Sequence, residues 1–166
     1  MTASAAQAFT RPAAADDERA LRAIYRSTRA GELEAVGWTA PMIDTFCDLQ
    51  FDMQQAHYGT AFPNLERQVV VEADGSVIGH VTVDRQPTGH TLVDVAVLPV
   101  HRGRGIGTRL LDGVVAAANA ADVPIVLTVS KTNPAISLYK RIGFQIESTT
   151  DLDHKMRRPA AGKRER

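Results

Sequence analysis

The chain has 166 residues, a formal net charge of zero, 44% hydrophobic residues and 23% charged residues. This composition is typical of a globular protein, and the balanced charge gives no reason to expect nucleic acid as a partner. The single cysteine, Cys47, excludes an internal disulfide, no Cys/His cluster indicates a metal site, and no apolar run is long enough to cross a membrane. We therefore expect a cytoplasmic protein that binds neither a metal nor a membrane.

Residues 9–157 are predicted to form a single domain, because loops are short and no repeat or low-complexity linker interrupts them. The first eight residues, 1–8, are expected to be a disordered N-terminus. The segment 158–166, rich in arginine and lysine, is expected to be a basic disordered tail. A nucleic-acid role for this tail is left open as an alternative.

The N-terminal third is predicted to hold a short strand at 9–12 and two helices. Asp16 or Asp17 caps the first helix, and Thr39 caps the second, which has Pro41 in its first turn. Helical spacing predicts that the second helix buries one stripe, consisting of Met42, Phe46, Leu49 and Met53. Residues 54–58 are expected to lie at or beyond its end.

The rest of the chain is predicted to be rich in strands. A hairpin turn is indicated by Asp74-Gly75. We expect strands at 68–72, 76–84, 91–98, 123–129, 144–148 and 152–156, and helices at 105–120 and 134–142. Antiparallel hairpins followed by a strand–helix–strand crossover imply an α/β fold with one mixed sheet.

Residues 102–107 read Arg-Gly-Arg-Gly-Ile-Gly and connect the strand at 91–98 to the helix that follows it. Free amides and the dipole at a helix start favour a bound anion, and glycine lets the backbone approach a phosphate. Arg102 and Arg104 add guanidinium groups suited to a pyrophosphate. The stretch lacks the lysine of a P-loop, and its glycines are spaced differently from those of a dinucleotide-binding fingerprint.

A second motif, at residues 133–144, reads Asn-Pro-Ala-Ile-Ser-Leu-Tyr-Lys-Arg-Ile-Gly-Phe. Asn133 caps a helix that has Pro134 in its first position and ends at Gly143. Taken with the glycine loop, this order of elements resembles the GNAT superfamily of N-acetyltransferases. The family's loop has Gln or Arg, then Gly three residues later and Gly or Ala two residues after that, and Arg102, Gly105 and Gly107 match it.

The resemblance implies a mixed, mostly antiparallel sheet of about six to seven strands, with flanking helices and a central β–α–β wedge that holds acetyl-CoA. The first strand of the wedge would carry a bulge, beyond which the two strands splay apart. The residues implied for acetyl-CoA binding are Val95, Ala96, Val97, Leu98, Arg102, Gly103, Arg104, Gly105, Ile106, Gly107, Thr108, Asn133, Ala135 and Tyr139.

The reaction that the resemblance implies is direct attack of a substrate amine on the thioester. Tyr139 would be the acid that protonates the departing thiolate, and the Val97 amide would donate to the developing oxyanion. Several family members place a glutamate base where this chain has Thr128, which cannot serve. Asp94 is the leading base, and the alternatives are ordered water, His80, His57 and Asp84.

The acceptor would bind at Gln54, His57 and Tyr58 and would be a small-molecule amine, an amino acid derivative or a peptide N-terminus. A non-catalytic acyl-CoA sensor or assembly protein with the same fold is the alternative function. A longer acyl donor also stays open. The chain is expected to act as a monomer or homodimer.

Overall fold

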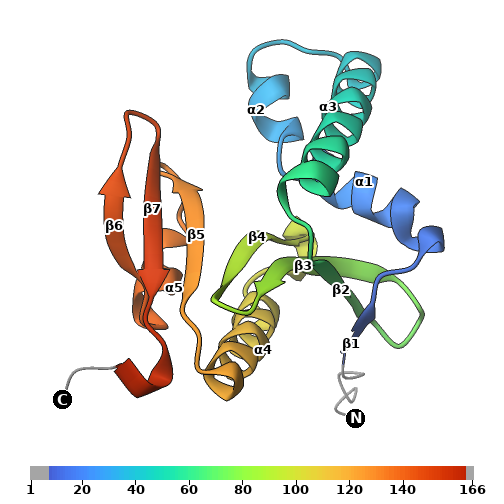
Figure 1. The fold of residues 1–166 in the computed structure, drawn as a ribbon. Coiled ribbons are helices and arrows are strands. Elements are labelled where there is room, and N and C mark those ends of the chain that lie inside the picture. The colour runs from blue at the N-terminus through green and yellow to red at the C-terminus, as the bar shows by residue number, and fades with distance from the viewer. Residues whose placement is uncertain (1–7, 164–166) are drawn as a thin grey trace.

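The computed structural model describes residues 8–163 (Figure 1). The first elements are β1 (Phe9–Pro12), α1 (Glu18–Ser27), α2 (Ala30–Ala35), α3 (Ala40–Ala61) and β2 (Leu65–Val71). The middle of the chain forms β3 (Val77–Gln86), β4 (Gly89–Val97), α4 (Ile106–Ala121) and β5 (Ile125–Ser130). The last elements are α5 (Ile136–Arg141), β6 (Gln145–Thr149) and β7 (Asp153–Arg158).

Seven strands of residues 8–163 form one sheet in the order β1-β2-β3-β4-β5-β7-β6. Neighbouring strands are antiparallel except β4 and β5, which are parallel. A parallel pair needs a crossover connection, and α4 supplies it. The predicted mixed, mostly antiparallel sheet is therefore confirmed, and so is the turn at Asp74-Gly75, where Gly75 has a φ of +87°.

Helices pack against both faces of the sheet. Consecutive residues Val69 and Val70 of β2 belong to different cores, because side chains alternate between the faces of a strand. Val69 packs with apolar residues of α1 and α3, among them Tyr25 and Phe51. Val70 packs in the core that α4 and α5 share with the rest of the sheet. The fold thus has a face covered by α1 and α3 and a face covered by α4.

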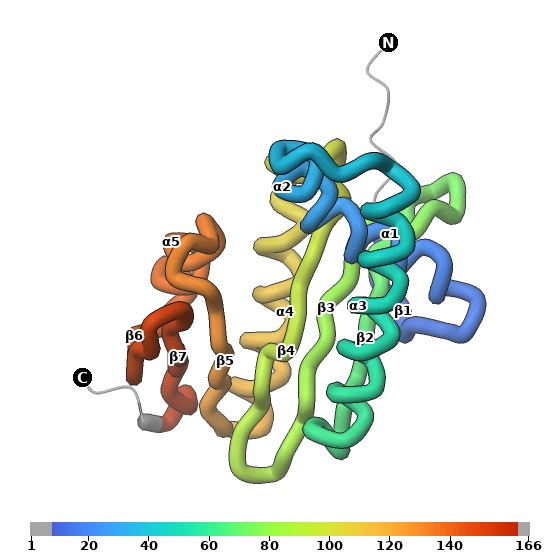
Figure 2. Tube along the Cα trace, turned by 90° about the horizontal axis from the view of Figure 1, so that it is seen from above, coloured from blue at the N-terminus to red at the C-terminus, as the bar shows by residue number. Residues whose placement is uncertain are grey.

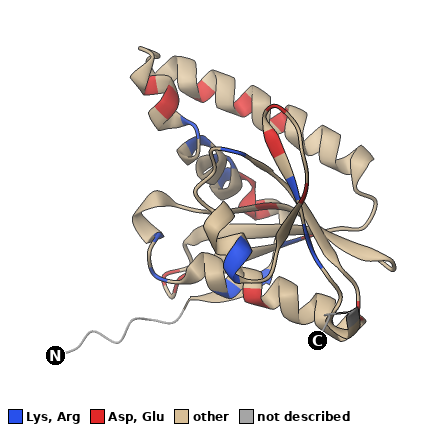
Figure 3. Ribbon diagram, turned by 90° about the vertical axis from the view of Figure 1, so that its left-hand side faces the viewer, with Lys and Arg blue, Asp and Glu red and all other residues tan. Residues whose placement is uncertain are grey.

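Helix α3 buries a different stripe from the one expected. Met42, Leu49 and Met53 are 50%, 57% and 58% exposed, so the predicted stripe is wrong. The buried residues of α3 are Ile43, Cys47 and Phe51. Acidic positions recur along the helix (Figure 3), and Asp44, Asp48 and Asp52 form ion pairs with Arg22 and Arg26 of α1. These exposed pairs link α3 to α1, and the helix is apolar on more than one side.

The end of the chain differs from the predicted tail. Arg158 ends β7 and is 3% exposed, Ala160 is 4% exposed, and the Gly162 amide donates to Asp122 Oδ1 at 2.9 Å. Arg158 and Ala160 are therefore buried in the domain and Gly162 is bonded to it, and β7 runs two residues further than the sequence pattern indicates. Residues 164–166 of the expected tail and 1–7 of the expected disordered N-terminus lie outside the described residues.

Candidate active site

The centre of the sheet opens where β4 and β5 separate. Their ladder consists of His90 opposite Ile125 and Thr91 opposite Val126. Directly after it, the β3–β4 register shifts, so that Val93 is the extra residue of a β-bulge. Figure 2 shows β5 diverging from β4 toward α5. The bulge and the splayed wedge implied by the sequence are both present.

Backbone groups of β4 face this opening. The Leu98 amide donates to the Ile78 carbonyl at 2.8 Å, which makes these residues a hydrogen-bonded pair of the β3–β4 ladder. Because such pairs alternate along antiparallel strands, the amides and carbonyls of Val95 and Val97 point away from β3 and toward the gap. Arg102 Nε donates to the Val97 carbonyl at 3.0 Å and so joins the glycine loop to the end of β4.

A cavity of about 950 Å³ occupies the opening. Its walls come from the turn between α1 and α2, the end of β4, the glycine loop, the first turn of α4, and the segment from β5 to α5. The structure brings most of the predicted cofactor residues together here, namely Val95, Ala96, Val97, Arg102, Gly103, Gly105, Ile106, Gly107, Thr108, Asn133, Ala135 and Tyr139. Ser27, Thr28, Arg29 and Glu32 line it as well and were not predicted.

Two predicted cofactor residues do not line the cavity. Leu98 is directed into the core that α4 shares with the sheet. Arg104 Nη1 lies 3.5 Å from Glu72 Oε1, and His101 Nδ1 lies 3.4 Å from the same oxygen. Because Glu72 belongs to the turn between β2 and β3, the Arg104 side chain faces that turn. The loop pattern could not reveal Glu72, because it lies about thirty residues away along the chain.

The glycine loop has the backbone geometry that an anion site requires. Gly103 and Gly105 have φ angles of +76° and +77°, which strain any residue with a side chain. Helix α4 begins at Ile106, and the first amides of a helix have no acceptors within it. The amides of 106–108 are thus free to donate to a ligand in the cavity.

Helix α5 carries Tyr139 to the same cavity. Asn133 Oδ1 accepts from the Ala135 amide at 2.9 Å and fixes the start of the helix. Tyr139 is 6% exposed and packs edge-on against Phe144, with ring centroids 5.9 Å apart. Burial, and secondarily the negative charge of Asp94, raises the pKa of Tyr139 to about 12. The phenol therefore keeps its proton at neutral pH.

Asp94 lies on the face of the sheet that α1 and α3 cover, rather than in the cavity wall. His80 Nε2 is 3.6 Å from Asp94 Oδ2, and the His80 side chain is 7% exposed while that of Asp94 is 31% exposed. Thr82 Oγ1 is 3.4 Å from His80 Nδ1 and accepts from Arg67 Nε at 2.9 Å. Four polar side chains of three adjacent strands therefore form one row.

Sequence reasoning did not identify Arg67 and Thr82 as members of this site. A signal was present, because Arg67 shares a strand face with the buried Val69, and an arginine on an apolar face needs partners. Those partners became visible only with the strand register, which sets Arg67 opposite Thr82 and Thr82 opposite Asp94.

The predicted acceptor residues lie within α3 and not beyond it, because the helix continues to Ala61. Tyr58 is half-buried, and burial followed by the charge of Asp94 raises its pKa to about 12. Gln54 is half-buried one turn earlier, whereas His57 is exposed. The unpredicted Gln55 accepts from Arg67 Nη2 at 3.0 Å.

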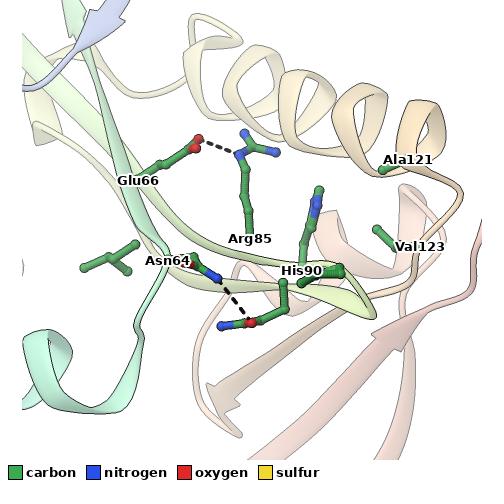
Figure 4. A pocket seen from close by; sticks show the side chains of 9 residues that line it. Asn64, Glu66, Arg85, His90, Ala121 and Val123 are labelled. Atoms are coloured by element: carbon green, nitrogen blue, oxygen red, sulfur yellow. Dashed lines mark hydrogen bonds and ion pairs between the residues drawn. The ribbon is translucent and has the colours of Figure 1, made fainter.

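The remaining base candidate, Asp84, lies elsewhere. It is buried, and its carboxylate accepts from the Asn64 amide at 2.8 Å and from Gln86 Nε2 at 3.0 Å. A cavity of about 660 Å³ opens near the end of β3 (Figure 4). Arg85 Nε donates to Glu66 Oε2 at this cavity, and His90 there is buried. Asp84 therefore stabilises the loop before β2. It lies near the C-terminal end of β3, whereas His80 lies near the start of that strand.

Residues 8–163 show neither a cluster of metal-ligating side chains nor a helix that could cross a membrane. The described side chains contain no cluster of three or more histidine, cysteine, aspartate or glutamate residues that could hold a metal ion. Within the same range, no helix combines the length and the apolar character needed to cross a membrane.

Comparison with protein families matches residues 64–146, half of the chain, to the acetyltransferase (GNAT) domain. A curated N-alpha-acetyltransferase from Sulfurisphaera tokodaii is 38% identical over a 93-residue alignment that covers 46% of this chain and 54% of the relative. The L-amino acid N-acetyltransferase AaaT from Escherichia coli is 37% identical over 90 residues, 50% of this chain and 56% of the relative. The matched regions thus span about half the length of these relatives.

Solved structures share the fold. The PaiA N-acetyltransferase from Thermoplasma acidophilum, solved in complex with coenzyme A, superposes with a TM-score of 0.73 at 17% identity, covering 92% of this chain and 99% of its own. An acetyltransferase from Thermus thermophilus has a TM-score of 0.66 at 18% identity and covers 93% and 98%. At these identities the likeness concerns the fold.

Proposed function

The chain belongs to the GNAT acetyltransferase family, and on that basis we propose that it transfers an acetyl group from acetyl-CoA to a primary amine. One observation carries this proposal. The cavity between β4 and β5 joins three things that the reaction needs, namely free strand amides, a glycine loop at a helix start, and a buried phenol. Each of these comes from a different element, so their convergence depends on the whole fold.

The residues around the cavity fit coenzyme A. The amides at 106–108 and the Arg102 guanidinium would hold the pyrophosphate, since both kinds of donor suit phosphate oxygens. The backbone of Val95 and Val97 would pair with the amide groups of the pantetheine arm in the manner of an added strand. The solved complex of the PaiA N-acetyltransferase with coenzyme A supports this choice of ligand.

Acetyl-CoA supplies the thioester carbonyl to which the amine adds. An amine arrives protonated at neutral pH, so Asp94 takes its proton, directly or through a water molecule. The Val97 amide donates to the carbonyl oxygen as negative charge develops there. Tyr139 gives its proton to the departing thiolate, and its raised pKa means that this proton is still present at neutral pH.

We propose that the acceptor is the α-amine of an amino acid or a peptide. One relative is named an N-alpha-acetyltransferase and the other an L-amino acid N-acetyltransferase. Gln54 and Tyr58 of α3 would contact it, together with Arg29 at the turn after α1, which lines the cavity and stacks on Tyr25 at 4.5 Å. A guanidinium at this position suits a carboxylate or a peptide carbonyl.

A non-catalytic acyl-CoA sensor is the second candidate. Thr128 is exposed on β5 at the position where the family resemblance implies a glutamate base. The absence of a carboxylate at this position favours a protein that binds acyl-CoA without catalysing acyl transfer. The cluster around Asp94 argues for the enzyme, because it supplies another carboxylate, whose charge raises the pKa of both Tyr58 and Tyr139.

The test combines turnover and binding on one sample. Thiol release from acetyl-CoA is measured against amino acids, peptides with free N-termini, polyamines and aminoglycosides, and coenzyme A is titrated by calorimetry. We expect release with an amino acid or peptide, and Asp94→Asn should lower kcat and flatten the acidic limb of its pH profile. Asp112→Asn is the matched control, since Asp112 is exposed on α4. Coenzyme A binding without release from any amine would favour the sensor, and no binding would overturn both proposals.

A further inference from the structure

A row of polar side chains crosses three strands beneath α3, and the proposed reaction does not by itself require all of it. The row runs from Gln55 through Arg67, Thr82 and His80 to Asp94, with successive polar atoms 3.0, 2.9, 3.4 and 3.6 Å apart. Thr82 has no exposed surface, and His80 is 6% exposed. A buried polar row of this kind is expensive unless its groups satisfy one another.

One order of donors and acceptors satisfies every group of the row from Arg67 to His80. A guanidinium has hydrogens and no lone pair to offer, so Arg67 Nε donates and Thr82 Oγ1 accepts. The Thr82 hydroxyl hydrogen then remains for its other neighbour, His80 Nδ1. With Nδ1 protonated, Thr82 Oγ1 would accept twice and its hydroxyl hydrogen would be buried without this acceptor, because Thr82 has no exposed surface. The arrangement that satisfies both groups has Nδ1 as the unprotonated nitrogen of the ring. His80 carries its proton on Nε2, the nitrogen that faces Asp94.

The surroundings also keep His80 neutral. Burial lowers the pKa of His80, Asp94 of β4 opposes that effect, and Arg67 of β2 lowers the pKa further. From α3, the neutral Tyr58 faces the same region, with a pKa raised by burial and by Asp94. Arg67 itself is held in place by Gln55, so the cation cannot swing away without losing a bond.

We propose that Thr82 is a positioning residue for the acetyl transfer, which holds His80 as the Nε2–H tautomer and thereby orients Asp94 as the base. The inference rests on the proposed function for its kinetic part only. His80 directs its Nε2 hydrogen at Oδ2, and the separation of 3.6 Å would shorten in the complex with substrate. Oδ1 is then left for the acceptor ammonium, whose proton moves to Asp94 and on to solvent, because this side chain is 31% exposed.

The experiment compares Thr82→Val with Thr82→Ser. Valine keeps the shape of the buried side chain and removes the hydroxyl, whereas serine keeps the hydroxyl and should restore the wild-type behaviour. Imidazole nitrogen NMR reports the tautomer of His80, and kinetics with acetyl-CoA and the best acceptor report kcat, KM and their pH dependence. We expect Thr82→Val to give a mixture of tautomers and roughly tenfold lower kcat, with unchanged affinity for coenzyme A.

The outcomes separate this inference from the proposed function. A wild-type Nε2–H tautomer in Thr82→Val, or a wild-type kcat, would overturn the positioning role. Absence of turnover in the wild type would overturn the proposed function, while the NMR comparison would still decide what Thr82 does to His80.

Should Thr82→Val fail to fold, Arg67→Lys serves instead, because an ammonium on a flexible stem cannot reproduce the planar fork that bonds Thr82 and Gln55. We expect the same mixed tautomer there, and a single Nε2–H form would count against the proposal.

Discussion

Arg158, the last residue of β7, donates from Nη1 to Asn119 Oδ1 of α4 at 2.9 Å. Its Nε also donates to the Ile142 carbonyl at the end of α5, at 3.0 Å. The two helices that border the cavity, α4 and α5, are thus joined by one buried side chain from a third element. Because the β4–β5 ladder is short, this link adds a polar connection between the two parts of the sheet.

Replacing Arg158 by lysine should destabilise the fold. A lysine ammonium cannot reach both Asn119 and Ile142 in the fork geometry, so at least one buried acceptor loses its partner. We expect the free energy of unfolding to fall by about 2 kcal/mol in urea titrations. Arg157→Lys is the control, since the Arg157 side chain is 48% exposed and should tolerate lysine with little change. Equal effects of both variants would show that the buried bonds contribute nothing.

The glycine loop gives a prediction about cofactor affinity. Gly105→Ala introduces a side chain at a φ of +77°, where no other atom lies within 4 Å of the new Cβ. Within the protein itself the substitution then acts through backbone strain, which would shift the amides at the start of α4. We expect coenzyme A to bind roughly tenfold more weakly by calorimetry, equivalent to about 1.4 kcal/mol.

Gly113→Ala is the matched control for this loop variant. Gly113 lies in the middle of α4, has open space around its Cβ position and does not have a positive φ. Alanine should raise helix stability there by up to about 1 kcal/mol and leave the affinity for coenzyme A unchanged. A Gly105→Ala protein that binds coenzyme A like the wild type would contradict the assignment of the loop to the pyrophosphate.

The sequence located two parts of the cavity wall because each of them is local. The loop at 102–107 and the helix capped by Asn133 each lie within a dozen residues, so turn chemistry and spacing define them. The start of α3 after Thr39 and the turn at Gly75 follow from local rules in the same way. Such features do not depend on which strand pairs with which.

Features that depend on distant partners were missed. Arg67 meets Thr82 only through the β2–β3 register, and Arg158 meets Asn119 across 39 positions of sequence. Helix α3 shows the same limitation, because its apolar residues occupy several sides and periodicity could not select the buried one. The ion pairs of Arg22 with Asp48 and Asp52 accompany the observed orientation, and they become visible only when α1 and α3 are side by side.

At acidic pH, the free energy of unfolding should depend on the ionisation of Asp17. It accepts from Arg11 at 2.7 and 2.9 Å and from the Ala14 amide at 2.7 Å. The bonds to Arg11, followed by the bond from Ala14, lower the pKa of Asp17 from 3.8 to about 2. Because the folded pKa is the lower one, the carboxylate stabilises the fold above about pH 4. This contribution is lost as the pH falls from about 4 to about 2.

The measurement for Asp17 is the urea midpoint of the wild type and of Asp17→Asn between pH 2 and pH 6. We expect the wild type to be more stable at pH 6 and the two proteins to converge near pH 2. Asp16→Asn is the control, because Asp16 is exposed beside Asp17. A difference between wild type and Asp17→Asn that stays constant over this range would exclude ionisation of Asp17 as its cause.

Tyr139→Phe tests the acid directly. Phenylalanine keeps the ring and its packing on Phe144, so the fold and the affinity for coenzyme A should remain those of the wild type. The thiolate would then leave without a proton from the enzyme, and kcat should fall by roughly 10²-fold.

Since burial raises the pKa of Tyr139 to about 12, its proton persists through the usual assay range, and wild-type kcat should show no alkaline decline from this group below about pH 11. Tyr25→Phe is the control, because Tyr25 lies in the core between α1 and α3 and should keep wild-type kcat. An unchanged kcat in Tyr139→Phe would remove the phenol from the acid role and leave solvent to protonate the thiolate.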